Sequence, residues 1–464
     1  MKKYTLTLLF LLVAWLLPAQ VSGQRHHIRT RRSVTVDYGA TLNTGHPEVF
    51  GGKSWPIDSA KSQELLDAGV TVCIGYLRLA RLVPPTSNAE YRAGIGVPGS
   101  VADPDTWDWT GQDEQKSLNF AKSIGIKLNL MIRDVAGWNS YTGTAQGVPN
   151  DWDVYEDIVK KVYQHLLPDE VEIWNEPDYS MKIAGSPYDD TVSAYIDLYY
   201  HAAHAIRTVS SSVPIGGPNF CCSGADQWVG PFLTSPTIPA NYINFLAYHN
   251  YNDGNSEAPN GIDVVRLTHQ YRPGLPVYLG EWNAGSACGT TPLDDNDPGT
   301  VAFAGMRLVN AIRAGISEAG YWALFFDRTC SFFTRGLEDP LLPKARTWLL
   351  MSQKLGLGAG VFSVKASSGS SVTTTLGAIN STGQRVAVVV NNNSQPQAVS
   401  VMLRNTGLVT PAVVNVYTAD SSDDPSVPTL TQPQTVANGT VTLIVNLPAY
   451  SVVGLMLSPG REGE

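Results

Sequence analysis

Positive charge and long apolar runs are both scarce in this chain of 464 residues. The 32 Lys and Arg residues are outnumbered by 41 Asp and Glu, which gives a formal net charge of −9. Phosphate binding requires clustered Lys and Arg, so this balance argues against a nucleic-acid partner. Beyond residue 17 no apolar run is long enough to cross a bilayer, so no membrane span is expected in the mature chain. Apolar residues nonetheless make up 43% of the chain, enough for a large core.

Cysteine is also rare, and its spacing matches no zinc-binding template. Cys288 and Cys330 each follow one of two neighbouring expected strands, which favours a bridge between them. A separate bridge between the adjacent Cys221 and Cys222 would be strained, and the spacing leaves it open. Cys73 lies in an apolar strand pattern and is expected to be a buried free thiol. No metal site is expected, because the acidic run at 294–297 lacks the Gly and final Glu of a calcium loop.

The first 23 residues have the pattern of a secretory signal peptide. Lys2 and Lys3 precede an apolar run at 6–17, and small residues at 21–23 provide a cleavage site. An uncleaved anchor is the alternative. The sequence therefore predicts a signal peptide over 1–23, a linker over 24–33, and a secreted or periplasmic protein.

Between residues 34 and 355 short β-like runs alternate with helical patterns. Such alternation is typical of parallel strands joined by crossover helices. Eight runs predict an α/β fold, a (β/α)8 TIM barrel, with a doubly wound sheet as the alternative. The runs are residues 34–36, 69–74, 127–132, 170–174, 214–217, 243–247, 277–280 and 320–324.

The composition changes near residue 356, where Val, Thr, Ser and Asn become frequent. Short alternating runs such as 385–390 recur, and Asn438-Gly439 is a hairpin-turn signal. No helical pattern continues here. We expect a C-terminal β-sandwich domain over 356–458 and a loose tail over 459–464.

Two glutamates stand where the fourth and seventh expected barrel strands end. Glu176 follows Trp174-Asn175, and Glu281 precedes Trp282-Asn283. Active sites of (β/α)8 enzymes lie at this end of the strands, so the two carboxyl groups should face each other across the barrel mouth. Glycoside hydrolysis needs such a pair, one carboxyl to protonate the leaving oxygen and one to attack the anomeric carbon.

Five further residues are candidates for substrate binding. Asn175 can donate to the sugar 2-hydroxyl, a contact that strengthens in the transition state. His249 and Tyr251 follow the sixth strand with side chains on one face, and Trp322 can stack on a sugar ring. Asn219 lies just after the fifth strand. Arg133 and Arg328 are alternatives for binding a uronate carboxylate, and His46 for bordering the sugar.

The ordered set of motifs resembles glycoside hydrolase family 39, which contains β-xylosidases and α-L-iduronidases. The similarity extends over about residues 35–350. It implies a retaining glycosidase with Glu176 as acid/base and Glu281 as nucleophile. Arg78 departs from the pattern, since the wider clan has an Arg nearer the strand end. The motifs are 173–177, Ile215-Gly216-Gly217-Pro218, 223–228, 247–251, 279–283 and Tyr321-Trp322.

The sequence thus predicts an exported retaining hydrolase of O-glycosidic bonds in poly- or oligosaccharides, most similar to β-xylosidases. α-L-Iduronidase, α-L-arabinosyl and endo-glycosidase activities are alternatives within the family. A carbohydrate-binding barrel without turnover is the alternative from another class. No cofactor is implied, because acid and nucleophilic catalysis suffice.

Overall fold

The computed structural model describes most of the chain and leaves its ends and several loops aside. The described residues are 32–53, 62–109, 119, 121–251, 261–283, 297–322, 324, 342–369, 373–409, 411–420 and 428–460. The signal-peptide prediction and residues 24–31 of the predicted linker therefore lie outside these residues, as do Cys288, Arg328 and Cys330. Residues 32 and 33 of the predicted linker instead begin strand β1. Among the described helices, none combines the length and apolar character needed to cross a membrane.

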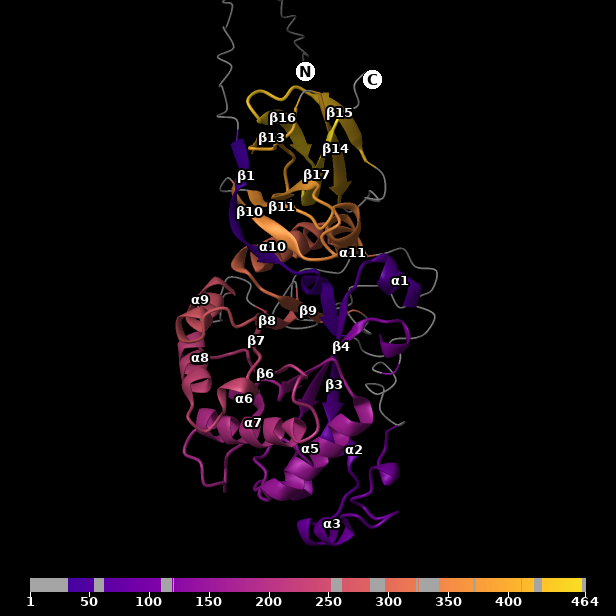
Figure 1. Ribbon diagram of the computed structural model, residues 1–464, viewed down its shortest axis with the longest axis vertical. Coiled ribbons are helices and arrows are strands. Elements are labelled where there is room, and N and C mark those ends of the chain that lie inside the picture. The colour runs from indigo at the N-terminus through magenta and orange to yellow at the C-terminus, as the bar shows by residue number, and fades with distance from the viewer. Residues whose placement is uncertain are drawn as a thin grey trace, which may run out of the picture. The chain divides into compact units, whose positions relative to one another are not determined.

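Eight parallel strands form a closed barrel in the order of the chain. The (β/α)8 prediction is confirmed, and seven of the eight predicted runs coincide with barrel strands (Figure 1). The strands are β2 (Gly51–Lys53), β3 (Val72–Arg78), β4 (Lys127–Arg133), β5 (Glu170–Ile173), β6 (Ile215–Phe220), β7 (Phe245–Asn250), β8 (Val277–Trp282) and β9 (Glu318–Trp322).

Helices connect these strands as the alternating pattern predicts. In α5 (Trp152–Leu166), apolar residues recur at helical spacing and are buried, and Asp151 accepts the N–H of Val154 as N-cap. The longer α7 (Thr191–Arg207) is capped in the same way by Asp190. The other helices are α1 (Ser62–Asp67), α2 (Leu79–Leu82), α3 (Asn88–Gly94), α6 (Pro177–Ser180), α8 (Ala225–Thr234), α9 (Gly261–Tyr271), α10 (Gly299–Ala314) and α11 (Pro343–Trp348), with short 3-10 turns at η1 (Pro47–Phe50), η3 (Pro104–Thr106), η4 (Gly137–Asn139) and η5 (Ala240–Tyr242) and a π-helical turn at η6 (Leu349–Lys354).

The predicted first barrel strand is wrong. Residues 34–36 lie in β1 (Arg32–Gly45), which pairs with β10 and β13 of the C-terminal domain (Figure 1). The barrel instead begins with β2, whose three residues carry almost no strand signal. A Cβ on Gly51 would approach Val72 to 2.0 Å, and one on Gly52 would approach Leu324 to 2.4 Å, so glycine is needed there for close packing.

The C-terminal domain is one nine-stranded sheet that folds over its own apolar face. Valines and leucines from both ends of the sheet share this core, which confirms the sandwich. The predicted turn at Asn438-Gly439 has positive φ at both residues. Besides β1, the strands are β10 (Phe362–Ser368), β11 (Thr373–Ile379), β12 (Arg385–Asn391), β13 (Gln397–Arg404), β14 (Ala412–Ala419), β15 (Leu430–Gln434), β16 (Val441–Leu447) and β17 (Ser451–Pro459).

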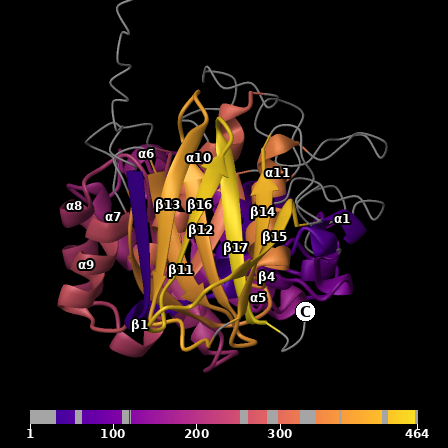
Figure 2. The ribbon, with the colours of Figure 1, turned by 90° about the horizontal axis from the view of Figure 1, so that it is seen from above.

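The other face of this sheet packs against α10 and α11, which lie behind the strands in Figure 2. At Gly305 of α10 the approach is close, since a Cβ there would meet the Val452 side chain at 2.4 Å. Val388, Val390 and Val452 belong to the same buried cluster as the barrel. The sandwich and the barrel therefore share a continuous apolar interface.

Candidate active site

Glu176 is held by an unusual local backbone at the end of β5. Trp174 and Glu176 both have positive φ, 69° and 51°, before Pro177 begins α6. The carbonyl of Glu176 accepts the N–H groups of Tyr179 and Ser180 at 3.0 and 2.7 Å. Left-handed backbone at a non-glycine residue is costly and tends to occur at functional sites. Here it turns the chain so that the Glu176 side chain lies at the barrel mouth.

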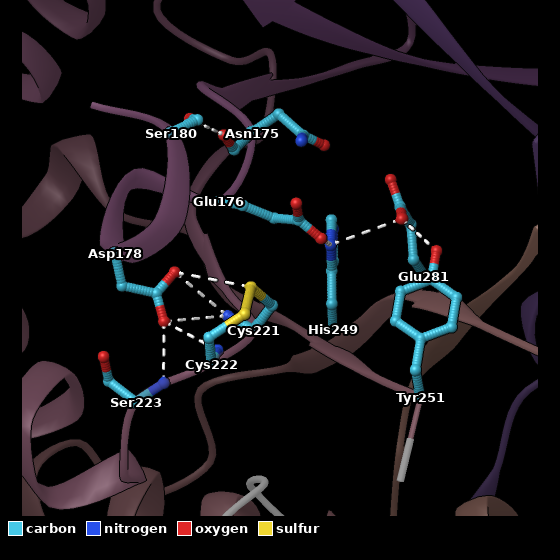
Figure 3. The surroundings of a disulfide bond; sticks show 10 residues. All are labelled: Asn175, Glu176, Asp178, Ser180, Cys221, Cys222, Ser223, His249, Tyr251 and Glu281. Atoms are coloured by element: carbon cyan, nitrogen blue, oxygen red, sulfur yellow. Dashed lines mark hydrogen bonds and ion pairs between the residues drawn. A yellow bond between two sulfur atoms is a disulfide. The ribbon is translucent and has the colours of Figure 1, made fainter. Parts of the chain in front are cut away.

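Glu281 lies in β8, across the mouth from Glu176, and its side chain is only 5% exposed. The imidazole of His249 stands between the two glutamates (Figure 3). Its Nδ1 is 2.9 Å from Oε1 of Glu176 and 3.4 Å from Oε2 of Glu281. The Tyr251 hydroxyl donates to the same Glu281 oxygen. The structure thus brings Glu176, Glu281, His249 and Tyr251 together.

One oxygen of each glutamate and one nitrogen of His249 all lie within 4.8 Å of one another. Such a cluster has the ligand types of a metal site. It also places two carboxyl groups near the separation of about 5 Å that direct attack on a sugar carbon requires. The arrangement can therefore deliver a proton from one side of a glycosidic bond and a nucleophile from the other.

A hydrogen-bond chain that sequence reasoning missed lies beside Glu281. Nζ of Lys53 is 2.6 Å from Oε1 of Glu281 and donates to the Tyr76 hydroxyl at 2.9 Å. Tyr76 in turn donates to Oδ1 of Asn175 at 3.0 Å. The sequence does not predict a role for Lys53, because the three residues of β2 carry no clear strand pattern. It does not predict one for Tyr76 either, because Tyr76 lies in an ordinary apolar strand pattern. The chain connects Glu281 to the predicted sugar-binding amide.

Trp322 and Asn219 occupy different positions around this cluster. The Trp322 ring is partly exposed and meets the Tyr76 ring edge-on, with centroids 5.5 Å apart. Asn219 is fully buried, and its Nδ2 donates to the Trp174 carbonyl at 3.1 Å. This contact supports the strained turn before Glu176. Asn219 therefore lies beneath the cluster, whereas Trp322 borders it.

Arg133 and Arg78 line a neighbouring cavity of about 220 Å³, together with Asp134 and Trp174. The Arg133 guanidinium lies over the Tyr76 ring, 5.5 Å from its centroid. Burial raises the pKa of Asp134 to about 7, against the effect of the nearby arginines. His46 instead precedes η1 and the start of β2, at the opposite end of the barrel, so the expectation that it borders the sugar is wrong.

Cys221 and Cys222 form a disulfide next to the site, a bridge that the sequence left open. The Asp178 carboxylate, two residues after Glu176, accepts the backbone N–H groups of Cys222 and Ser223 at 2.7 and 2.8 Å. It also accepts that of Cys221 at 3.2 Å (Figure 3). Cys73 is a buried cysteine outside this disulfide, as predicted.

The environments of the two glutamates shift their pKa values in opposite directions. Burial raises the pKa of Glu281, and the Lys53 ion pair opposes this rise without cancelling it. Burial also acts to raise the pKa of Glu176, but the His249 hydrogen bond and nearby positive charges hold it below its ordinary value. Burial lowers the pKa of His249 to about 4, so its imidazole is neutral at pH 7.

Part of the chain matches a known family model. Residues 163–326 match the family model "Glycosyl hydrolases family 39". That stretch contains all seven predicted site residues, namely Asn175, Glu176, Asn219, His249, Tyr251, Glu281 and Trp322. Lys53 and Tyr76 lie outside it.

Two curated relatives are both named β-xylosidase. The protein of Caldicellulosiruptor saccharolyticus is 25% identical over 235 residues, covering 44% of this chain and 46% of its own. That of Geobacillus stearothermophilus is 28% identical over 226 residues, covering 42% of each chain. The aligned region thus spans less than half the length of these relatives.

Among solved structures, the chain is similar to the family 39 enzyme of Xanthomonas axonopodis pv. citri. The TM-score is 0.61 at 15% identity, over 95% of this chain and 100% of that one. This likeness concerns the fold, a barrel followed by a sandwich. The family model and the two curated relatives show that part of this chain, including the paired glutamates at the fourth and seventh barrel strands, is similar to glycoside hydrolase family 39.

Proposed function

We propose that this protein is an exported glycoside hydrolase that cleaves O-glycosidic bonds of poly- or oligosaccharides with retention of anomeric configuration. The observation that carries the proposal is the approach of Glu176 and Glu281, whose carboxyl oxygens come within 4.8 Å of each other. Retaining enzymes hold this pair about 5–5.5 Å apart, whereas inverting enzymes leave room for a water at about 6.5–9.5 Å. The proposed export rests on the signal-like pattern of residues 1–23.

In the first step Glu176, which takes up its proton when substrate is bound, gives that proton to the glycosidic oxygen, and the bond from that oxygen to the anomeric carbon breaks. A carboxylate oxygen of Glu281 attacks the same carbon and forms a glycosyl ester. In the second step the Glu176 carboxylate takes a proton from water. The resulting hydroxide oxygen bonds to the anomeric carbon, and Glu281 leaves as a carboxylate. Each group returns to its starting state.

The substrate that we propose first is a β-xyloside, because both curated relatives are named β-xylosidase. Glycosides of other neutral or acidic sugars belong in the same panel of test substrates. The net charge of −9 gives the protein no general attraction for polyanions.

The test is turnover of a broad panel of aryl glycosides by the purified protein, with NMR of the first-formed sugar anomer. We expect turnover with the anomer retained, and Glu281→Gln should abolish it. Glu90→Gln, on the exposed helix α3, is the matched control and should behave as the wild type. An inactive wild type that still binds sugars would make the protein a carbohydrate-binding barrel instead, and the inverted anomer would refute retention.

A further inference from the structure

Lys53 is an unusual residue for the interior of a barrel. Its side chain is 1% exposed, yet it carries an ammonium group at the C-terminal end of β2. Its Nζ donates to Oε1 of Glu281 at 2.6 Å, to the Tyr76 hydroxyl at 2.9 Å and to Sδ of Met131 at 3.8 Å. A buried ammonium is tolerated only when its charge and its hydrogen atoms are matched. Here Glu281 supplies the matching charge.

Through its contact with Tyr76, Lys53 also affects Asn175, the amide predicted to bind the sugar. A tyrosine hydroxyl has a single hydrogen, which Tyr76 donates to Oδ1 of Asn175, so it accepts from Lys53. The oxygen end of the Asn175 amide is thereby committed to Tyr76. Its NH2 end is then the one that can donate to a sugar hydroxyl. Lys53 therefore influences both Glu281 and the orientation of Asn175.

We propose that Lys53 is a positioning residue: it holds Glu281 as an oriented carboxylate and, through Tyr76, fixes the amide of Asn175 toward the sugar. This inference rests on the proposed function, because it assigns Glu281 as the nucleophile. Lys53 and Tyr76 lie before the matched stretch 163–326, whereas Glu281 and Asn175 lie within it.

The surroundings of Glu281 leave Lys53 as the group that favours its charged form. The side chains facing Glu281 come from the ends of three strands, β2, β5 and β7. His249 is neutral at pH 7, and burial keeps Tyr251 protonated. Glu176 is a second acid and disfavours the charge. Lys53 is thus, among the described residues that contact Glu281, the one with a positive charge at neutral pH.

The same ion pair acts at both steps of the proposed reaction. When the glycosyl ester forms, Glu281 loses its charge, and the ammonium of Lys53 can donate to the ester carbonyl. When water cleaves the ester, Lys53 stabilises the departing carboxylate. A neutral residue at position 53 would make Glu281 harder to ionise and a poorer leaving group.

Lys53→Met tests this directly, since it keeps the length and removes the charge. An opposite charge at this distance lowers a carboxyl pKa by about 1–3 units. We therefore expect the acidic limb of the kcat/KM profile to move up by about 1–3 pH units. Lys53→Arg keeps the positive charge, so it should return the acidic limb at least in part to its wild-type pH. Lys365→Met removes a similarly buried lysine of the sandwich and should leave it unmoved.

Tyr76→Phe tests the second half of the chain and remains informative if Lys53→Met does not fold. The wild type should favour a glycoside over its 2-deoxy analogue, because Asn175 donates to the 2-hydroxyl. In Tyr76→Phe this preference should fall at least about tenfold, the loss of one hydrogen bond of about 1.4 kcal/mol. Asn175→Ala lacks the contact with the 2-hydroxyl altogether, so its preference for the glycoside over the 2-deoxy analogue is the lowest value expected.

The outcomes separate the two claims. A wild type that is inactive on the whole panel refutes the proposed function, and this inference falls with it. An active wild type together with a folded Lys53→Met whose acidic limb is unchanged refutes the role of Lys53 alone. An unchanged 2-deoxy preference in Tyr76→Phe refutes the coupling to Asn175.

Discussion

The Nδ1 atom of His249 lies 2.9 Å from the Glu176 carboxylate, while its Nε2 is buried without a hydrogen-bond partner among the described residues. This asymmetry places the proton of the neutral ring on Nδ1, where the Glu176 carboxylate can accept it. Protonating the ring would add a charge inside a fully buried site. His249 is therefore suited to hold Glu176 in place as a neutral donor.

The first prediction concerns stability at acidic pH. The folded pKa of His249 is about 4, below its ordinary value of 6.5, so between these pH values the unfolded chain binds more protons. Stability from this residue is present above about pH 6.5 and is lost as the pH falls to about 4, a change of about 3 kcal/mol. Urea unfolding at a series of pH values measures it.

His249→Asn keeps a donor near the position of Nδ1 and removes the titrating ring. Its free energy of unfolding should decline less steeply than that of the wild type between pH 6.5 and 4. Parallel curves for the two proteins would contradict the neutral, buried state of His249.

The second prediction separates the acid role of Glu176 from simple structural support. Glu176→Ala should lower kcat by about 10²–10⁴-fold for glycosides with poor leaving groups, since these depend on proton donation. Aryl glycosides with good leaving groups should lose much less in the first step. Added azide should restore turnover and yield a glycosyl azide of unchanged anomeric configuration, detected by NMR. Equal losses for both leaving groups, without azide rescue, would count against this role.

The third prediction concerns Asp178 and the disulfide loop. The Asp178 carboxylate accepts three successive backbone N–H groups from Cys221, Cys222 and Ser223, and α6 carries it two residues after Glu176. Asp178→Ala should cost about 1–2 kcal/mol in unfolding free energy.

The same variant should reduce kcat more for poor than for good leaving groups, because the backbone that aims Glu176 loosens. Asp189→Ala, an exposed residue before α7, is the control for a general charge effect. If both aspartate variants keep wild-type kinetics, Asp178 does not position Glu176.

The fourth prediction uses the crowding at Gly280, directly before Glu281. A Cβ there would lie 2.8 Å from Oδ1 of Asn219 and 3.3 Å from the His249 ring. Gly280→Ala should therefore destabilise the fold by about 1–3 kcal/mol. It should also lower activity by displacing His249. Gly137→Ala, where a Cβ meets nothing closer than 3.4 Å, should change neither thermal stability nor kinetics.

Patterns local in the chain were sufficient to predict much of this molecule. Seven barrel strands coincide with short β-like runs in the sequence, and the two glutamates stand at the ends of two of them in distinctive sequence contexts. What could not be predicted depends on long-range packing. The three residues of β2 are strand because β3 and β9 flank them, not because of their own preference.

Lys53 illustrates the same limit at the site. An isolated lysine after two glycines carries no signal of burial, and its partners Tyr76 and Glu281 are 23 and 228 residues away. The predicted first strand failed for the opposite reason. Residues 34–36 do form a strand, but a β-branched run does not reveal which sheet it joins.

The placement of β1 between β10 and β13 has a consequence for how the protein is made. Residues 32–45 are synthesised before the barrel, while their partners, residues 362–368 and 397–404, are synthesised after it. This strand therefore stays unpaired with them until the whole barrel has been synthesised. A fragment that starts after the barrel would carry a gap in the middle of its sheet, so the C-terminal domain is a discontinuous folding unit.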